Sequence, residues 1–251
     1  MAFTAFSAQT SAAEPAAKRR SPIALFLLLP GILYLILFFV TPLISLVITS
    51  FQEPDPVRFG SFVNAFRWEN YVIVLYGEQS LRSAGFAALA TLFALLIGFP
   101  LGYFIGITLR PYPLLQGLAL VLVIAPFFIS FLLRTLAWKQ IFSDEGPIAG
   151  VLGALAILPP GQAITGTAFS VIFGLTYNFV PFMTLPIYAT LASLDLRLLE
   201  AGNDLYGSPA VTFRTVTLPL SAAGVMSGTL LTFIPAAGDY INASREFLGS
   251  T

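Results

Sequence analysis

The sequence contains neither cysteine nor histidine, and only 10% of its 251 residues are charged. Without thiols or imidazoles, the chain can form no disulfide, no thiolate nucleophile and no histidine–metal bond. Its twelve basic and twelve acidic residues cancel, so no excess of positive charge favours nucleic acid as a partner. We therefore expect no catalytic residues, no metal, no cofactor and no nucleic-acid partner, although aspartyl and Ser/Lys chemistries remain open on composition alone.

Apolar residues make up 57% of the chain, too large a share for so few charges to cover a soluble globule. A helix needs roughly 20 apolar residues to cross the hydrocarbon of a bilayer. Uncharged runs of that length recur along the sequence. They predict an all-α polytopic membrane protein that has the lipid bilayer as its solvent. The expected spans are 23–50, 83–109, 112–133, 165–193 and 215–237.

The first residues, 1–20, form an Ala-, Ser- and Thr-rich segment without apolar periodicity, which we predict to be a disordered cytoplasmic tail. Residues 21–251 are expected to form one transmembrane domain. Basic residues divide equally between the two sides, so the run Lys18-Arg19-Arg20 directly beside the first span is what favours a cytoplasmic N-terminus. A cleaved signal peptide is the alternative, but its apolar region is about 7–15 residues long and ends in a small-residue cleavage site.

Polar or short segments separate the expected spans. Residues 52–82 hold scattered charges and several aromatic rings, and we expect a solvated loop with a piece at the membrane interface. Residues 148–158 are too few to span and predict a re-entrant or interfacial helix. Prolines occur within all five spans, where they kink helices. They either line a pathway that opens and closes or reflect the general frequency of proline in membrane helices.

The most polar stretch near the C-terminal end, 194–214, predicts two short helices joined by a turn. Asp195 can cap a helix that begins at Leu196, and Gly207 can adopt the left-handed conformation that ends it. Ser208 can then cap a second helix that has Pro209 at its first position.

Helical spacing divides the first of these helices into two faces. An apolar face, with Gly202 in its middle, is expected to lie on the protein itself: Leu198, Leu199, Leu205 and Tyr206. A charged face is expected to meet a partner: Arg197, Glu200 and Asp204. Glycine inside a helix costs about 1 kcal/mol against alanine, so Gly202 suggests that another backbone comes close. An ordinary amphipathic loop between two spans is the alternative.

The residues Glu200-Ala201-Gly202, Gly207 and 216–219 (Val-Thr-Leu-Pro) resemble the EAA loop of permease subunits of ABC importers. The resemblance implies the ABC importer permease fold, with 194–214 as a cytoplasmic loop whose short helix docks in a groove of an ATP-binding subunit. The coupling residues that it implies are Glu200, Ala201, Gly202, Asp204, Gly207 and Pro219. Residues 204–209 are similar to the spermidine/putrescine-type members in particular. Further matches to the family are 132–139, 144–147, 177–183 and 233–240.

The sequence departs from the family pattern at three points. Gly202 stands where the family usually has alanine, which would weaken the coupling helix. Tyr206 stands where many members have the glycine found here at Gly207. Members usually have a sixth span after the segment that matches Asp239, whereas this sequence ends twelve residues later. We therefore expect five spans of six, and a truncated, inactive copy is one interpretation.

The resemblance also implies partners and a location. These are a pair of ATP-binding subunits, a second permease subunit and an extracytoplasmic substrate-binding protein, in the cell (inner) membrane. The chain has no G-x-x-x-x-G-K-[ST] loop, so we expect ATP hydrolysis in the partner and no enzyme activity here. A channel or secondary transporter is the alternative class, but it would usually show ionisable residues within spans or inverted repeats, and we find neither.

A polyamine such as spermidine or putrescine is a flexible cation, which carboxylates and aromatic faces would bind. The candidate substrate path consists of Tyr177, Phe179, Phe182, Asp239 and Tyr240. Each of these rings can instead contact lipid or pack between helices. No carboxylate lies in mid-span, so selectivity is expected to depend chiefly on the binding protein, and another small solute remains an alternative substrate.

Overall fold

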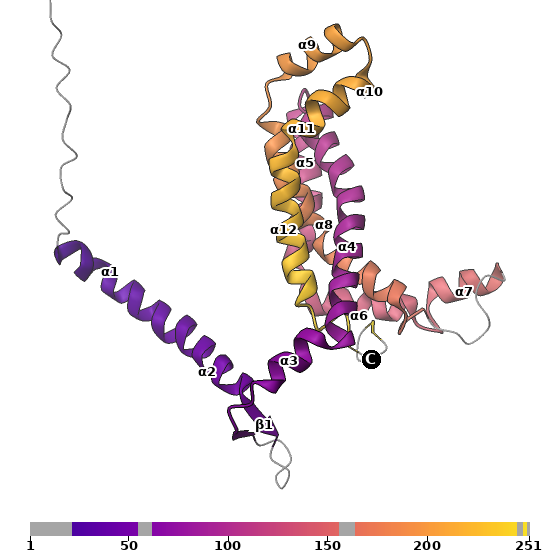
Figure 1. Cartoon of the computed structure of the whole chain (residues 1–251). Helices are drawn as coiled ribbons and strands as arrows, with labels where there is room; N and C mark the ends of the chain where they lie inside the picture. The colour runs from indigo at the N-terminus through magenta and orange to yellow at the C-terminus, as the bar shows by residue number, and fades with distance from the viewer. Residues whose placement is uncertain (1–21, 55–61, 156–163, 245–247, 250–251) are drawn as a thin grey trace, which may run out of the picture. The chain divides into compact units, whose positions relative to one another are not determined.

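The computed structural model describes residues 22–54, 62–155, 164–244 and 248–249. The predicted N-terminal tail lies outside these residues. The chain divides into two compact units, Met1–Leu75 and Tyr76–Thr251, which are described separately. The described residues are almost entirely helical, as the apolar runs predict (Figure 1).

The first unit begins with a long apolar helix. Its parts are α1 (Pro22–Leu35), the π-helical turn η1 (Ile36–Val40) and α2 (Thr41–Ser50). Pro42 has no N–H to continue the α-helical pattern, and the backbone widens just before it, where the N–H of Thr41 donates to the Ile36 carbonyl five residues back. The side chains from Phe26 to Thr49 are exposed, so the described residues of the unit leave this part of the helix uncovered.

The segment after this helix is more structured than the predicted solvated loop. Strands β1 (Gln52–Pro54) and β2 (Phe62–Asn64) pair antiparallel, with Glu53 opposite Val63. Helix α3 (Glu69–Tyr76) follows. These strands and this helix were not predicted, because their side chains bond to the end of α2 and to one another, contacts that hydropathy alone does not reveal. That the segment is solvated, with a piece at the membrane interface, stays a prediction.

Three helices form the centre of the second unit. They are α4 (Glu78–Tyr103), which continues through the π turn η2 (Phe104–Thr108), α8 (Ala168–Ala192) and α12 (Ala222–Ala237), and they lie side by side (Figure 1). Small residues let α4 approach α8: a Cβ added at Gly102 would lie 2.9 Å from Cγ2 of Ile187. Such small-residue contacts are typical of helices that pack within membranes.

Two of the expected spans contain sharp bends. The segment predicted over 112–133 comprises α5 (Pro113–Ile124) and the 3-10 turn η3 (Ala125–Phe128), and α6 (Phe131–Phe142) then leaves at 91°. Pro126 cannot donate to the helix, and Ile129 and Ser130 are extended. The helical run α10 (Pro209–Thr212), η4 (Phe213–Thr217) and α11 (Leu218–Leu220) meets α12 at 61°. Neither segment is one straight helix.

A short helix follows α6, as the sequence predicted. The N–H of Gly146 donates to the Ser143 carbonyl at 3.0 Å, which makes the turn, and α7 (Pro147–Ala154) begins with a proline. The rest of the region expected for this helix, 156–158, lies outside the described residues.

By length and composition, three helices of the described chain could cross a membrane: Phe26–Ser50, Glu78–Thr108 and Ala168–Ala192. The number rises to five if each bent pair counts as one span. That these five segments cross the bilayer stays a prediction.

Candidate coupling element and substrate path

The stretch predicted as two short helices has that structure. Helix α9 (Leu196–Tyr206) begins after Asp195, whose Oδ1 accepts from the N–H of Arg197 at 3.0 Å. It ends at Gly207, which has a φ of 63° and whose N–H donates to the Asn203 carbonyl at 2.7 Å. A left-handed glycine at this position is a common helix terminator. Helix α10 then starts at Pro209, and the Ser208 side chain makes no capping bond in it.

Gly202 is buried where α9 lies against the next helical run. A Cβ added there would lie 2.8 Å from Cγ2 of Thr212 and 3.2 Å from Cγ2 of Val216. Real Cβ atoms essentially never come as close as the first of these distances. The glycine thus has a local reason: an alanine would push α9 away from α10 and η4.

The remaining predicted coupling residues of α9 and its turn are exposed: Glu200, Ala201, Asp204 and Gly207. The predicted apolar face is wrong for three residues, because Leu198, Leu205 and Tyr206 are exposed as well, Leu205 at 76%. The helix rests on a narrow line through Gly202, so little of its circumference is covered. An exposed apolar face and an exposed charged face therefore occur on the same helix, at the end of the bundle where Figure 1 shows α9 and α10.

Arg110 holds the start of this element and was not selected from the sequence. Its Nη1 donates to the Leu194 carbonyl at 2.7 Å, which joins the turn between η2 and α5 to the segment just before α9. The available signal was that Arg110 is the one charge between two long apolar runs.

Pro219 lies in α11, immediately before the 61° bend. At the bend, the Ser221 N–H and Oγ donate to the carbonyls of Thr217 and Leu218, each at 2.9 Å. Pro219 therefore belongs to the connection between α10 and α12, away from the exposed surface of α9.

The structure does not bring the five candidate path residues together. Phe179 is buried and its ring lies 6.3 Å from that of Phe131 and 5.8 Å from that of Phe182. The carboxylate of Asp239 accepts from the backbone N–H groups of Ile241 and Asn242 at 2.7 and 3.2 Å. Asp239 thus organises the turn after α12, and Tyr240 beside it is 79% exposed.

Tyr177, the fifth path residue, lines a cavity of about 660 Å³ between α4, α5 and α8. Apart from Tyr177 and Thr176, the lining is wholly apolar, with residues such as Phe93, Leu122 and Ile172. Such a lining suits a hydrocarbon occupant. To an ammonium group it offers aromatic faces and the hydroxyl groups of Tyr177 and Thr176, but no carboxylate.

Comparison with known proteins decides the family. No family model matches the chain. The chain is 35% identical over 208 residues to the spermidine/putrescine transport system permease protein PotB of Salmonella typhimurium, a match that covers 82% of this chain and 71% of the relative. PotB of Escherichia coli is also 35% identical over 208 residues, covering 82% and 74%. PotB of Haemophilus influenzae is 33% identical over 206 residues, covering 82% and 71%.

The chain belongs to the PotB family of ABC-importer permeases. The predicted resemblance to spermidine/putrescine-type permease subunits of ABC importers is thereby confirmed. That 194–214 is an EAA loop stays a prediction. A member of the PotB family is a transport subunit of the membrane and not an enzyme, as we predicted.

The structure of this PotB-family chain also shows polar side chains that the sequence reasoning missed. Asn178 is 1% exposed, and neither its Nδ2 nor its Oδ1 has a hydrogen-bond partner among the described residues. The same holds for Nε and Nη1 of Arg134, which is 8% exposed and lies 5.7 Å from the Phe131 ring centroid. Buried polar groups without partners are rare and costly. Asn178 could have been noticed as an amide inside an uncharged run.

Proposed function

We propose that the chain is a membrane permease of an ATP-driven importer for spermidine, putrescine or a related small cation, and that α9 receives the movement of an ATP-binding subunit. The observation that carries the coupling role is the exposed surface of α9, which has Glu200 and Asp204 on its charged face and the exposed Leu198, Leu205 and Tyr206 on its apolar face. Gly202 holds this helix closely on the chain's own α10. A helix that is packed on the permease along one side and exposed along the other can transmit the movement of a bound partner to the permease.

The partners proposed for this importer are two ATP-binding subunits, a second permease subunit and an extracytoplasmic binding protein. We further propose that the N-terminus and α9 lie on the cytoplasmic side, with the ATP-binding subunits. Closure of those subunits would bias the bent helices between outward-open and inward-open states, so that one contact couples two conformations.

The polyamine substrate is supported by the names of the relatives more than by the candidate path. Phe179 and Phe182 lie in a group of rings that includes Phe127, 4.9 Å from Phe182. Tyr177, Asp239 and Tyr240 complete the proposed path. Asn178 adds a carbonyl oxygen that could accept from an ammonium group. Arg134 favours the second candidate, an importer of another small solute, because a buried cation repels polyamines.

Uptake by the complete complex in proteoliposomes tests this function. Labelled spermidine should enter only when ATP is present on the side of the ATP-binding subunits, and unlabelled putrescine should compete. If an anionic solute competes and putrescine does not, the result favours the second candidate, an importer of another small solute. Uptake that needs no ATP would contradict the importer and favour a channel or secondary transporter.

A further inference from the structure

Four aromatic rings cap the end of the apolar helix in the first unit. Phe51 directly follows the last residue of α2 and is the C-cap of this helix. Its ring stacks on Phe66, with centroids 4.7 Å apart and planes at 4°, and lies 5.2 Å from the ring of Tyr71. Trp68 lies 6.1 Å from Phe51 and 5.3 Å from Tyr71. We call Phe51, Phe66, Trp68 and Tyr71 the aromatic cap.

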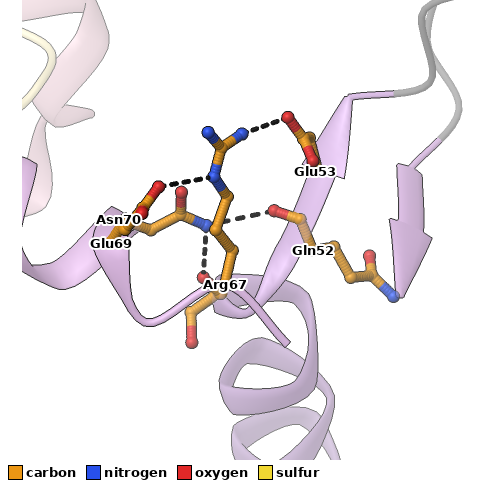
Figure 2. Close-up of polar contacts among 6 residues, drawn as sticks. Gln52, Glu53, Arg67, Glu69 and Asn70 are labelled. Atoms are coloured by element: carbon orange, nitrogen blue, oxygen red, sulfur yellow. Dashed lines mark hydrogen bonds and ion pairs between the residues drawn. The ribbon is translucent and has the colours of Figure 1, made fainter. Parts of the chain in front are cut away.

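Hydrogen bonds fix the aromatic cap to the last turn of α2. The hydroxyl groups of Tyr71 and Ser50 lie 2.5 Å apart. Nδ2 of Asn70 donates to the carbonyls of Ser50 and Gln52 at 3.0 and 3.1 Å (Figure 2). The N–H of Arg67 donates to the Phe51 carbonyl at 3.0 Å. These hydrogen bonds tie residues 67–71 to the end of α2.

The backbone of Phe66, a member of the aromatic cap, adopts an energetically unfavourable conformation. Its φ is +46°, the left-handed region that a bulky residue rarely adopts. Such a conformation persists when the surroundings determine it, and it is found most often at functional positions. The ring that this backbone presents is 80% exposed, so the strain serves a surface and not a core.

The charges of the cap region are paired with one another. Arg67 lies between Glu53 and Glu69 and forms an ion pair with each, the second at 3.1 Å (Figure 2). The hydrogen bond that Arg67 donates to the Glu69 carboxylate, together with the charges of Glu53 and Glu69, raises the pKa of the exposed Arg67. Arg67 thus offsets one of the two carboxylate charges near the exposed rings of Phe66 and Trp68.

We infer that the aromatic cap is an anchor for the boundary between lipid headgroups and hydrocarbon, which sets the depth of the helix Phe26–Ser50 in the bilayer. Aromatic rings with polar edges favour this boundary. The exposed rings continue directly from a helix that is uncharged and exposed on all sides, and the α3 residues Val72 and Ile73 extend the apolar surface. A lipid surface is favoured over a protein partner because the surface is continuous with a membrane-type helix.

Tryptophan fluorescence of the full chain in phosphatidylcholine vesicles tests this anchor. The chain has two tryptophans, so the difference between the natural protein and Trp68→Phe reports Trp68 alone. Trp138→Phe is the matched control, because Trp138 packs against Phe142 and Phe173 in the other unit. Lipids brominated near the headgroup end of their chains should quench Trp68 more strongly than lipids brominated near the chain ends, and aqueous iodide should quench it weakly.

Strong quenching of Trp68 by iodide with no quenching by either lipid would overturn the anchor, as would protection from iodide that arises only when a substrate-binding protein is added. Phe66→Asn provides a second test. Asparagine tolerates the left-handed backbone but removes the stacked ring, so the chain should still fold while Trp68 becomes more accessible to iodide. An unchanged quenching profile in this variant would also contradict the inference.

Discussion

At the scale of single residues, Gly202 is the point where α9 packs against α10 and η4. The space there is too small for a side chain at position 202. Gly202→Ala should lower the rate of ATP-driven uptake, because its Cβ would lie 2.8 Å from Cγ2 of Thr212. Overpacking of this kind costs roughly 1–3 kcal/mol. Thr212→Ser removes the opposing methyl group and should restore uptake in the double variant, as measured with labelled spermidine.

The matched control for this pair is Gly117→Ala, since a Cβ at Gly117 has nothing within 4 Å. It should leave uptake unchanged. If Gly202→Ala is as active as the natural protein, or if Thr212→Ser does not improve it, then the contact of α9 with α10 has no role in coupling.

Asn178 is the residue at which stability and transport should separate. Asn178→Leu replaces an amide without partners among the described residues by a side chain of similar size. Removal of an unsatisfied buried polar group is worth about 1–3 kcal/mol, so the melting temperature in detergent should rise. Uptake should fall because Asn178 belongs to the proposed substrate path. Unchanged uptake together with a higher melting temperature would show that Asn178 has no role in transport.

At the scale of elements, the hairpin between α4 and α5 is tied to the start of α9 by the bond from Arg110 to the Leu194 carbonyl. Arg110→Ala should weaken that connection, and a hydrogen bond from a charged group contributes about 1.5–3 kcal/mol. The expected result is faster proteolysis of the loop around α9 in membranes, with less change in Arg110→Lys. Equal proteolysis of Arg110→Ala and the natural chain would show that the bond is not needed.

The ends of helices could be predicted from the sequence where short-range chemistry decides them. Asp195 and Gly207 fix α9 through bonds within two or four residues. The bends after Phe128 and at Ser221 were not located, because proline marks a weak point without determining the angle. The outward position of Leu205 and Tyr206 was missed for another reason: periodicity shows which residues share a face, but only a tertiary contact, here at Gly202, decides which face is covered.

At the scale of the whole molecule, the apolar runs predicted the all-helical fold but not how the helices are placed beside one another. Hydropathy carries no information on lateral order, so Phe179, Asp239 and Tyr177 were assigned to one path although they lie in an aromatic group, a terminal turn and a cavity wall. The packing of α4, α8 and α12 rests instead on small residues such as Gly102. The two helices of 194–214 could be predicted because the residues that define them are contiguous in sequence.

The absence of cysteine permits a direct test of the central claim, that the exposed surface of α9 binds an ATP-binding subunit. A single Leu205→Cys variant should react with a water-soluble maleimide in the chain alone, because Leu205 is 76% exposed. Tyr240→Cys, 79% exposed after α12, is the matched control. Assembly with the ATP-binding subunits should protect the cysteine at position 205 and leave the one at 240 reactive. Equal reactivity of Leu205→Cys with and without these subunits, in a complex that transports, would contradict the account.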